Sequence, residues 1–102
     1  MNTANPAAIT STNLKENNMH YQYEPKGVCS RLIDFDIDEQ GKITNISFEG
    51  GCNGNLKAIG KLCEGMTADE ISGKLLGNTC GFRDTSCADQ LSKAVLEAKS
   101  KL

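Results

Sequence analysis

The chain of 102 residues has 38% hydrophobic residues, 24% charged residues and a formal net charge of −2, which fits one domain with a modest core. This charge argues against a nucleic-acid groove or an anionic membrane as the main partner, and two Tyr, three Phe and no Trp offer little surface for stacking on bases. No apolar run approaches the ~20 residues of a membrane span, and no secretory signal is recognisable, so we expect a cytoplasmic protein.

Residues 1–19 are predicted to form a flexible N-terminal tail. They are rich in Asn, Thr and Ala and lack apolar periodicity, so they have little surface to bury. A single domain is therefore expected over residues 20–102, without internal repeats. His20, the only His of the chain, stands at the start of this domain, where a solvated side chain is the ordinary interpretation.

A β-hairpin is predicted for the first half of this domain. Ile33, Phe35 and Ile37 alternate with Asp residues, as in a half-buried antiparallel strand. The residues from Asp38 to Gly41 suit a turn, because Gly readily adopts a positive φ. The return strand is carried by three apolar residues, Ile43, Ile46 and Phe48.

The same hairpin predicts that two cysteines lie close together. Cys29 precedes the first strand, and Cys52 follows the return strand and the Gly50-Gly51 pair. Counting outward from the turn places the two cysteines opposite each other to within about two residues, a difference that a bulge at the glycines could absorb. We therefore expect both at the open end of the hairpin.

Three helices follow in the predicted order of elements. The first begins at Asn53 or Asn55 and ends at Gly65, and the second begins with a capping box at Thr67 and runs to Leu75 or Leu76. The third begins at Cys87, with Ser86 as the N-cap residue and an apolar stripe that starts at Cys87 itself. Strands followed by helices predict an α+β fold, in which about three helices pack on one face of a small antiparallel sheet.

The cysteines are the candidate functional residues of this sequence. Five cysteines in a chain without an export signal point to metal binding or redox chemistry more than to a disulfide framework. Cys29, Cys52 and Cys87 each lie at the end of an element, and the last two precede helices, whose free N–H groups suit anionic sulfur. Such thiolates select zinc or an iron–sulfur cluster. Cys80 or Asp89 is the candidate fourth ligand.

Other interpretations remain open for these residues. Cys63 lies on a helical apolar stripe and is interpreted as a core residue. Cys80 and Cys87 could instead exchange electrons through a disulfide, which would make the protein a thiol-redox accessory. The glycine-rich run from Gly50 to Gly54 could cradle a phosphate and bind a nucleotide. A structural domain with merely buried cysteines is the remaining alternative.

The sequence resembles a known family at several places. Thr85-Ser86-Cys87-Ala88-Asp89 is similar to the signature of the TSCPD domain, with Ala88 in place of Pro, and the resemblance covers about residues 21–100. Further agreement lies at residues 27–30, 50–55 and 80–81. TSCPD domains occur as small stand-alone proteins and at the C-terminus of cobalamin-dependent ribonucleotide reductases. The resemblance thus implies an association with that enzyme and with deoxyribonucleotide synthesis, whereas 102 residues are too few for its catalytic subunit, so enzymatic activity is left open.

A weaker resemblance connects the order of elements with the NifU/IscU iron–sulfur scaffold proteins. Cys29, Cys52 and Cys87 match the positions of that family's three cluster-binding cysteines. Arg31 and Ser86 stand where that family has Asp and His. This resemblance implies a NifU/IscU-like fold, a cysteine-ligated metal or cluster, and a partner from an iron–sulfur pathway.

Overall fold

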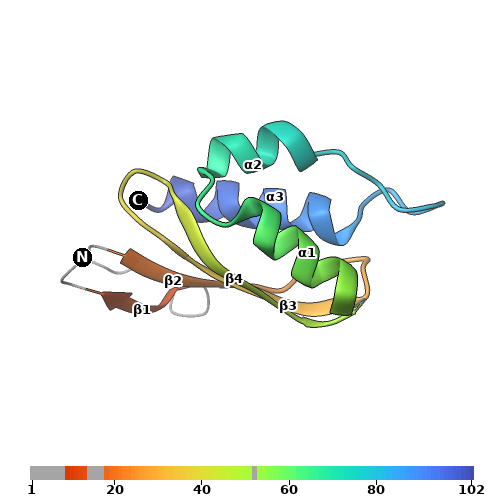
Figure 1. The fold of residues 1–102 in the computed structure, drawn as a ribbon, viewed down its shortest axis with the longest axis horizontal. Helices are drawn as coiled ribbons and strands as arrows, with labels where there is room; N and C mark the ends of the chain where they lie inside the picture. Colours follow the sequence, from red (N-terminus) through yellow and green to blue (C-terminus); the bar gives the residue numbers. More distant parts are fainter. Residues whose placement is uncertain (1–8, 14–17, 52) are drawn as a thin grey trace.

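The computed structural model describes residues 9–13, 18–51 and 53–102. Within these residues the strands come first and the helices follow. The strands are β1 (Ile9–Asn13), β2 (Asn18–Tyr23), β3 (Ser30–Ile37) and β4 (Ile43–Gly50), and the helices are α1 (Asn53–Cys63), α2 (Ala68–Leu75) and α3 (Cys87–Ser100). All neighbouring strands pair antiparallel in a sheet of order β1-β2-β3-β4 (Figure 1).

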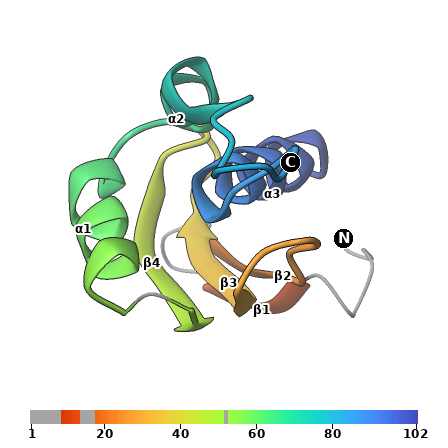
Figure 2. The same ribbon diagram turned by 90° about the vertical axis from the view of Figure 1, so that its right-hand side faces the viewer.

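The helices form a layer on one face of the sheet. Helix α1 packs against β4 and α3 packs against β3, while α2 lies on α3 (Figure 2). This arrangement confirms the α+β fold expected from the sequence. Because α1 and α3 lie over different strands, their N-terminal turns can line the two sides of one pocket at the end of the sheet.

The described part of the chain ahead of residue 20 differs from the expected tail. Ile9–Asn13 form β1 and pair with β2, which begins at Asn18. An added edge strand gains backbone hydrogen bonds from its neighbour without an apolar face of its own. Its residues therefore carry no periodicity that would predict a strand. The remaining residues of the expected tail, 1–8 and 14–17, lie outside the described part.

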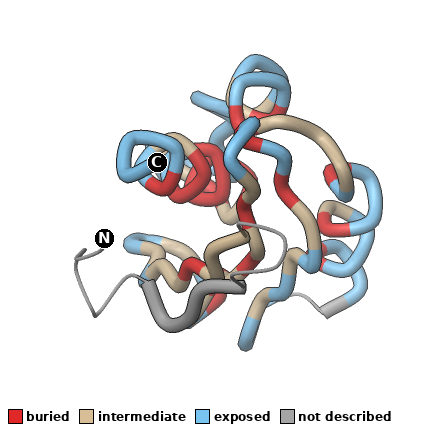
Figure 3. Tube along the Cα trace, turned by 90° about the vertical axis from the view of Figure 1, so that its left-hand side faces the viewer, coloured by how far each residue is buried: buried red, intermediate tan, exposed pale blue. Residues whose placement is uncertain are grey.

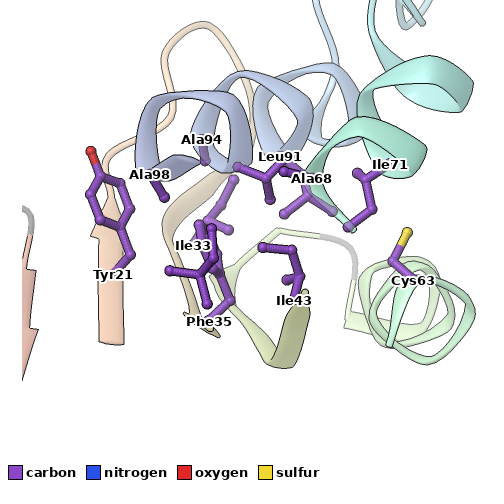
Figure 4. Packing of buried hydrophobic residues seen from close by; sticks show 12 residues of the cluster. Tyr21, Ile33, Phe35, Ile43, Cys63, Ala68, Ile71, Leu91, Ala94 and Ala98 are labelled. Carbon is purple, nitrogen blue, oxygen red and sulfur yellow. The ribbon is translucent and has the colours of Figure 1, made fainter. Parts of the chain in front are cut away.

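The core lies between the sheet and the helix layer. Figure 3 shows the most deeply buried backbone along β3 and α3, and Figure 4 shows how the side chains of the sheet meet those of α2 and α3. The fully buried residues of the core include Tyr21, Ile33, Phe35, Ile37, Ile43, Ile71, Leu91 and Val95. Alternation in β3 and helical spacing in α3 place these residues on the facing surfaces.

The predicted turns and caps are present. Gly41 has a φ of 83°, and its N–H donates to the carbonyl of Asp38 at 3.0 Å, which closes the hairpin turn. The hydroxyl of Thr67 accepts from the N–H of Glu70, and the Glu70 carboxylate accepts from the N–H of Thr67, so the capping box of α2 is confirmed. Ser86 caps α3 through the N–H of Asp89.

Two irregular pairings shape the hairpin. β4 has one more residue than β3 between the pairs Asp34–Ser47 and Asp36–Thr44, and β3 has one more between Ser30–Gly50 and Leu32–Glu49. The bulge in β4 lets Ile43 and Ile46, three positions apart, both pack toward the helices. It also explains why the apolar residues of this strand do not alternate strictly.

Asn45 stabilises the bulge in β4. Its φ is 54°, its amide Nδ2 donates to the Asp36 carboxylate at 2.8 Å, and its N–H donates to the Glu64 carboxylate. We expect Asn45→Ala to lower the free energy of unfolding by about 1–2 kcal/mol, because Ala tolerates positive φ poorly and loses the amide bond. Asn45→Gly should cost less, since it relieves the strain. Urea unfolding of both variants measures the difference, and equal losses would contradict this account.

Candidate functional site

The open end of the sheet brings four element ends together. The start of β3, the end of β4, the start of α1 and the start of α3 all lie at the end of the molecule from which the loop after α2 projects (Figure 1). Ser30 pairs with Gly50 across the hairpin, so Cys29 and Gly51 extend the two strands side by side. The segments that carry the candidate ligands therefore converge on one region.

Cys29 and Cys87 meet at this end. Their Sγ atoms are 4.0 Å apart although the residues are 58 positions apart in the sequence. The Ser30 hydroxyl lies 3.3 Å from the Cys87 sulfur. Cys29 is exposed and Cys87 is half-buried, so both thiols can be reached from solvent. The contact joins the first strand of the hairpin to the first turn of α3.

A pocket of about 440 Å³ opens beside this pair. Its wall includes Cys29, Cys80 and Cys87, and Arg83 adds a positive charge. Apolar residues of α1, among them Leu56, Ile59 and Leu62, form the opposite side. Cys80 thus lies at the same pocket as the other two cysteines, whereas Asp89 does not line it.

Cys52 lies outside the described residues, but its predecessor is placed. The backbone of Gly51 is so close to Cys29 that a methyl group on its Cα would stand 3.1 Å from the Cys29 sulfur. The hairpin register ends with Ser30 paired to Gly50, and the closeness of Cys29 and Cys52 stays a prediction.

Asp89 anchors the loop that carries Cys80. One carboxylate oxygen accepts the N–H of Gly77 at 2.6 Å, and the other accepts the Thr85 hydroxyl at 2.6 Å. The Thr85 hydroxyl, with the N–H of Gly77, lowers the pKa of this carboxyl below its ordinary value of 3.8. Lys93 adds an ion pair at 3.5 Å. Both oxygens are therefore occupied by protein donors, which gives Asp89 a positioning role beside the pocket.

The described residues bring two of the candidate metal ligands together. No three of their His, Cys, Asp or Glu side chains come close enough to hold a metal ion together. Two sulfurs bound to one tetrahedral zinc ion at about 2.3 Å would be about 3.8 Å apart, close to the Cys29–Cys87 separation of 4.0 Å. The donor pair thus fits one edge of a thiolate tetrahedron, and Cys80 at the pocket wall and Cys52 next to Gly51 are the residues that could complete it.

Comparison with protein families assigns the chain. The TSCPD domain matches residues 10–99, nearly the whole length. The chain belongs to the TSCPD domain family. No curated protein and no solved structure matches it, so the similarity to NifU/IscU scaffold proteins stays a prediction. In the part of the TSCPD domain that the structure describes, none of the helices has the length and apolar character needed to cross a membrane.

Cys63 is separate from this site. It is 5% exposed, belongs to the core cluster and lies at the end of α1, and burial raises the pKa of its thiol. The prediction that it acts as a small hydrophobic residue is confirmed. It provides a matched control for experiments on the other cysteines of the TSCPD domain.

The sequence grouped Cys29 and Cys87 in one ligand set, and the structure brings these two residues together. Sequence reasoning missed the Ser30 hydroxyl near the Cys87 sulfur, which is a product of tertiary packing. The sequence feature that could have identified Ser30 as a residue of the site is its position next to Cys29 at the start of a strand.

Proposed function

We propose that this TSCPD domain is a cysteine-ligated metal-binding module, with zinc as the favoured metal. The observation that carries this proposal is the 4.0 Å separation of the Cys29 and Cys87 sulfurs, which suits two ligands of one tetrahedral ion. Two thiolates on one iron of a [2Fe–2S] cluster have a similar separation, so an iron–sulfur cluster is the alternative cofactor.

The proposed ligands have distinct roles in this module. Cys29 and Cys87 hold the ion from β3 and α3, and Cys52 and Cys80 complete the set. Cys80 is preferred over Asp89 as the fourth ligand, because it lines the pocket while the Asp89 carboxylate is engaged with Gly77 and Thr85. When bound, zinc would cross-link the segments that carry the four cysteines.

The charge at the pocket and the proposed partner proteins are both consistent with a metal-binding module. Four thiolates on one divalent ion carry a net negative charge, which Arg83 at the pocket wall offsets. We propose a carrier or accessory role in the cytosol, where thiols stay reduced, with a ribonucleotide reductase or an iron–sulfur pathway protein as the partner. Family membership supports the first partner, because related domains stand at the C-terminus of cobalamin-dependent ribonucleotide reductases.

The test is elemental analysis of the protein purified anaerobically. We expect about one zinc per chain, and replacement by Co²⁺ should give the strong near-ultraviolet absorption of sulfur-to-cobalt charge transfer. Cys29→Ser, Cys52→Ser and Cys87→Ser should each abolish stoichiometric metal under competition by a chelator. Visible absorbance with iron and acid-labile sulfide would assign a cluster instead.

Controls separate ligand loss from unfolding. Cys63→Ala removes a cysteine of the core and should keep about one zinc per chain. Cys80→Ser should lose the metal if Cys80 is the fourth ligand and keep it if Asp89 is. A wild-type protein that stays free of zinc and iron after reconstitution, with unchanged thermal stability, would refute the proposal.

A further inference from the structure

We propose that Cys29 and Cys87 form a reversible disulfide and that this dithiol pair is a redox-sensitive modification site. The pairing differs from the Cys80–Cys87 exchange considered from the sequence. Formation of the bond requires only the geometry of the two thiols. Its consequence for metal, described below, rests on the proposed function.

The first argument is proximity. The two sulfurs are 4.0 Å apart, which is near van der Waals contact and about 2 Å longer than an S–S bond, and both residues are thiols in this structure. Cys29 lies in the irregular segment just before β3, and Cys87 is the first residue of α3. Bond formation therefore requires a movement of about 2 Å between the two sulfurs, one of which stands on an irregular segment.

The second argument is access. Cys29 is exposed, Cys87 is half-buried, and both line the pocket of about 440 Å³. An oxidant can thus reach the Cys29 sulfur, and the Cys87 sulfur lies next to it. Cys63, which is 5% exposed within the core, lacks both a neighbouring cysteine among the described residues and a path to solvent. The structure therefore predicts that the Cys29–Cys87 pair is oxidised in preference to Cys63.

The third argument is a second contact between the same two segments. The Cys87 sulfur lies 3.3 Å from the Ser30 hydroxyl, and Ser30 follows Cys29 directly in the chain. Two neighbouring residues at the start of β3 therefore contact the first residue of α3, which keeps the Cys87 sulfur beside Cys29.

The chemistry is a balanced thiol–disulfide exchange with a low-molecular-weight disulfide as oxidant. The Cys29 thiolate attacks one sulfur of that disulfide, its S–S bond breaks, and the first small thiolate leaves. The Cys87 thiolate then attacks the Cys29 sulfur of the mixed disulfide and expels the second small thiolate. Two protein thiols become one disulfide, and one small disulfide becomes two thiols. A reducing dithiol reverses both steps.

Oxidation would control the metal site. A disulfide sulfur carries no negative charge to donate to zinc, so joining Cys29 and Cys87 removes two proposed ligands at once. The expected outcome is release of about one zinc for each disulfide formed. Reduction restores both ligands and permits reloading.

The experiment titrates the full-length apo protein with glutathione redox buffers of increasing oxidised fraction. Samples are quenched with acid, alkylated with N-ethylmaleimide, digested and analysed by mass spectrometry. We expect a Cys29–Cys87 cross-linked peptide that disappears after dithiothreitol. The cross-link should persist in Cys63→Ala and Cys80→Ser and be absent in Cys29→Ser and Cys87→Ser, with circular dichroism confirming that each variant is folded.

Each outcome bears on one proposal. Alkylation of Cys29 and Cys87 throughout the titration, or a disulfide from either one to Cys52 or Cys80, would overturn the pairing. A zinc-loaded sample treated in parallel reports metal release with a chromogenic chelator. If the cross-link forms in a protein that never binds metal, the redox inference stands and the metal proposal fails. If zinc binds and no cross-link forms, the reverse holds.

Discussion

Replacing Asp89 with Ala is expected to lower the free energy of unfolding by about 3 kcal/mol. Asp89 is 3% exposed, and its carboxylate accepts from the N–H of Gly77 and the hydroxyl of Thr85, both at 2.6 Å. Hydrogen bonds to a charged group contribute about 1.5–3 kcal/mol each, though not additively, and their loss leaves donors without partners. Urea unfolding of the metal-free protein measures the change.

Asp89 should also make the free energy of unfolding of the domain depend on pH in the acid range. Because the folded state lowers the pKa of Asp89, folding favours the ionised carboxylate, and this stabilisation is present above the ordinary carboxyl value of 3.8. It is lost as the pH falls through the lower pKa of the folded state. The stability difference between wild type and Asp89→Asn should therefore shrink below about pH 4.

Asp84 supplies the control for both measurements. It is an exposed acid in the loop that Asp89 anchors, and Asp84→Ala should change the free energy of unfolding by less than about 0.5 kcal/mol. A loss for Asp84→Ala as large as that for Asp89→Ala would show that the buried carboxylate is not the anchor. Cys80 alkylation rates in the two variants add a local readout, because a released loop exposes Cys80 further.

Gly51→Ala is expected to destabilise the domain by about 2–4 kcal/mol and to weaken the cysteine site. Gly51 has a φ of 79°, which costs Ala about 1–2 kcal/mol. Its new methyl group would stand 2.9 Å from Leu56 Cδ1, 3.1 Å from the Cys29 sulfur and 3.1 Å from the N atom of Ser30. Overpacking of this kind costs about 1–3 kcal/mol, and relief requires moving Cys29 or α1.

Gly54→Ala is the matched control for this substitution. Gly54 lies in the first turn of α1, and a methyl group there meets no atom within 4 Å. Because Ala favours the helix, Gly54→Ala should be neutral or stabilising by up to about 1 kcal/mol. Thermal unfolding and zinc affinity of both variants test the pair. A Gly51→Ala protein as stable and as metal-competent as Gly54→Ala would contradict the close approach to Cys29.

Gly51 and Asp89 each determine the position of a cysteine at the pocket of the TSCPD domain. Gly51 permits the end of β4 to approach Cys29, and Asp89 holds the loop that brings Cys80 to the wall. Neither Gly51 nor Asp89 has to contact a bound metal ion to have this effect. Both are expected to control where the cysteines stand, and such positioning decides metal affinity as strongly as ligand identity.

The sequence by itself determined the local elements. Alternation of Ile33, Phe35 and Ile37 predicted β3, and the residues from Asp38 to Gly41 predicted the turn that the structure contains. Side-chain chemistry alone also predicted the start of α3, since the Ser86 hydroxyl caps the N–H of Asp89. Such signals are readable because the interacting groups are a few residues apart.

Only the tertiary structure decided the distances between the cysteines and what Asp89 does. The sequence grouped Cys29 with Cys87 as candidate ligands and offered Cys80 as an alternative redox partner of Cys87, and folding places the Cys29 sulfur 4.0 Å from that of Cys87. The sequence also offered Asp89 as a possible ligand, whereas folding engages its carboxylate with Gly77 and Thr85. β1 likewise depends on pairing with β2. Contacts between distant segments follow from how the sheet and helices pack, and that packing leaves no pattern in neighbouring residues.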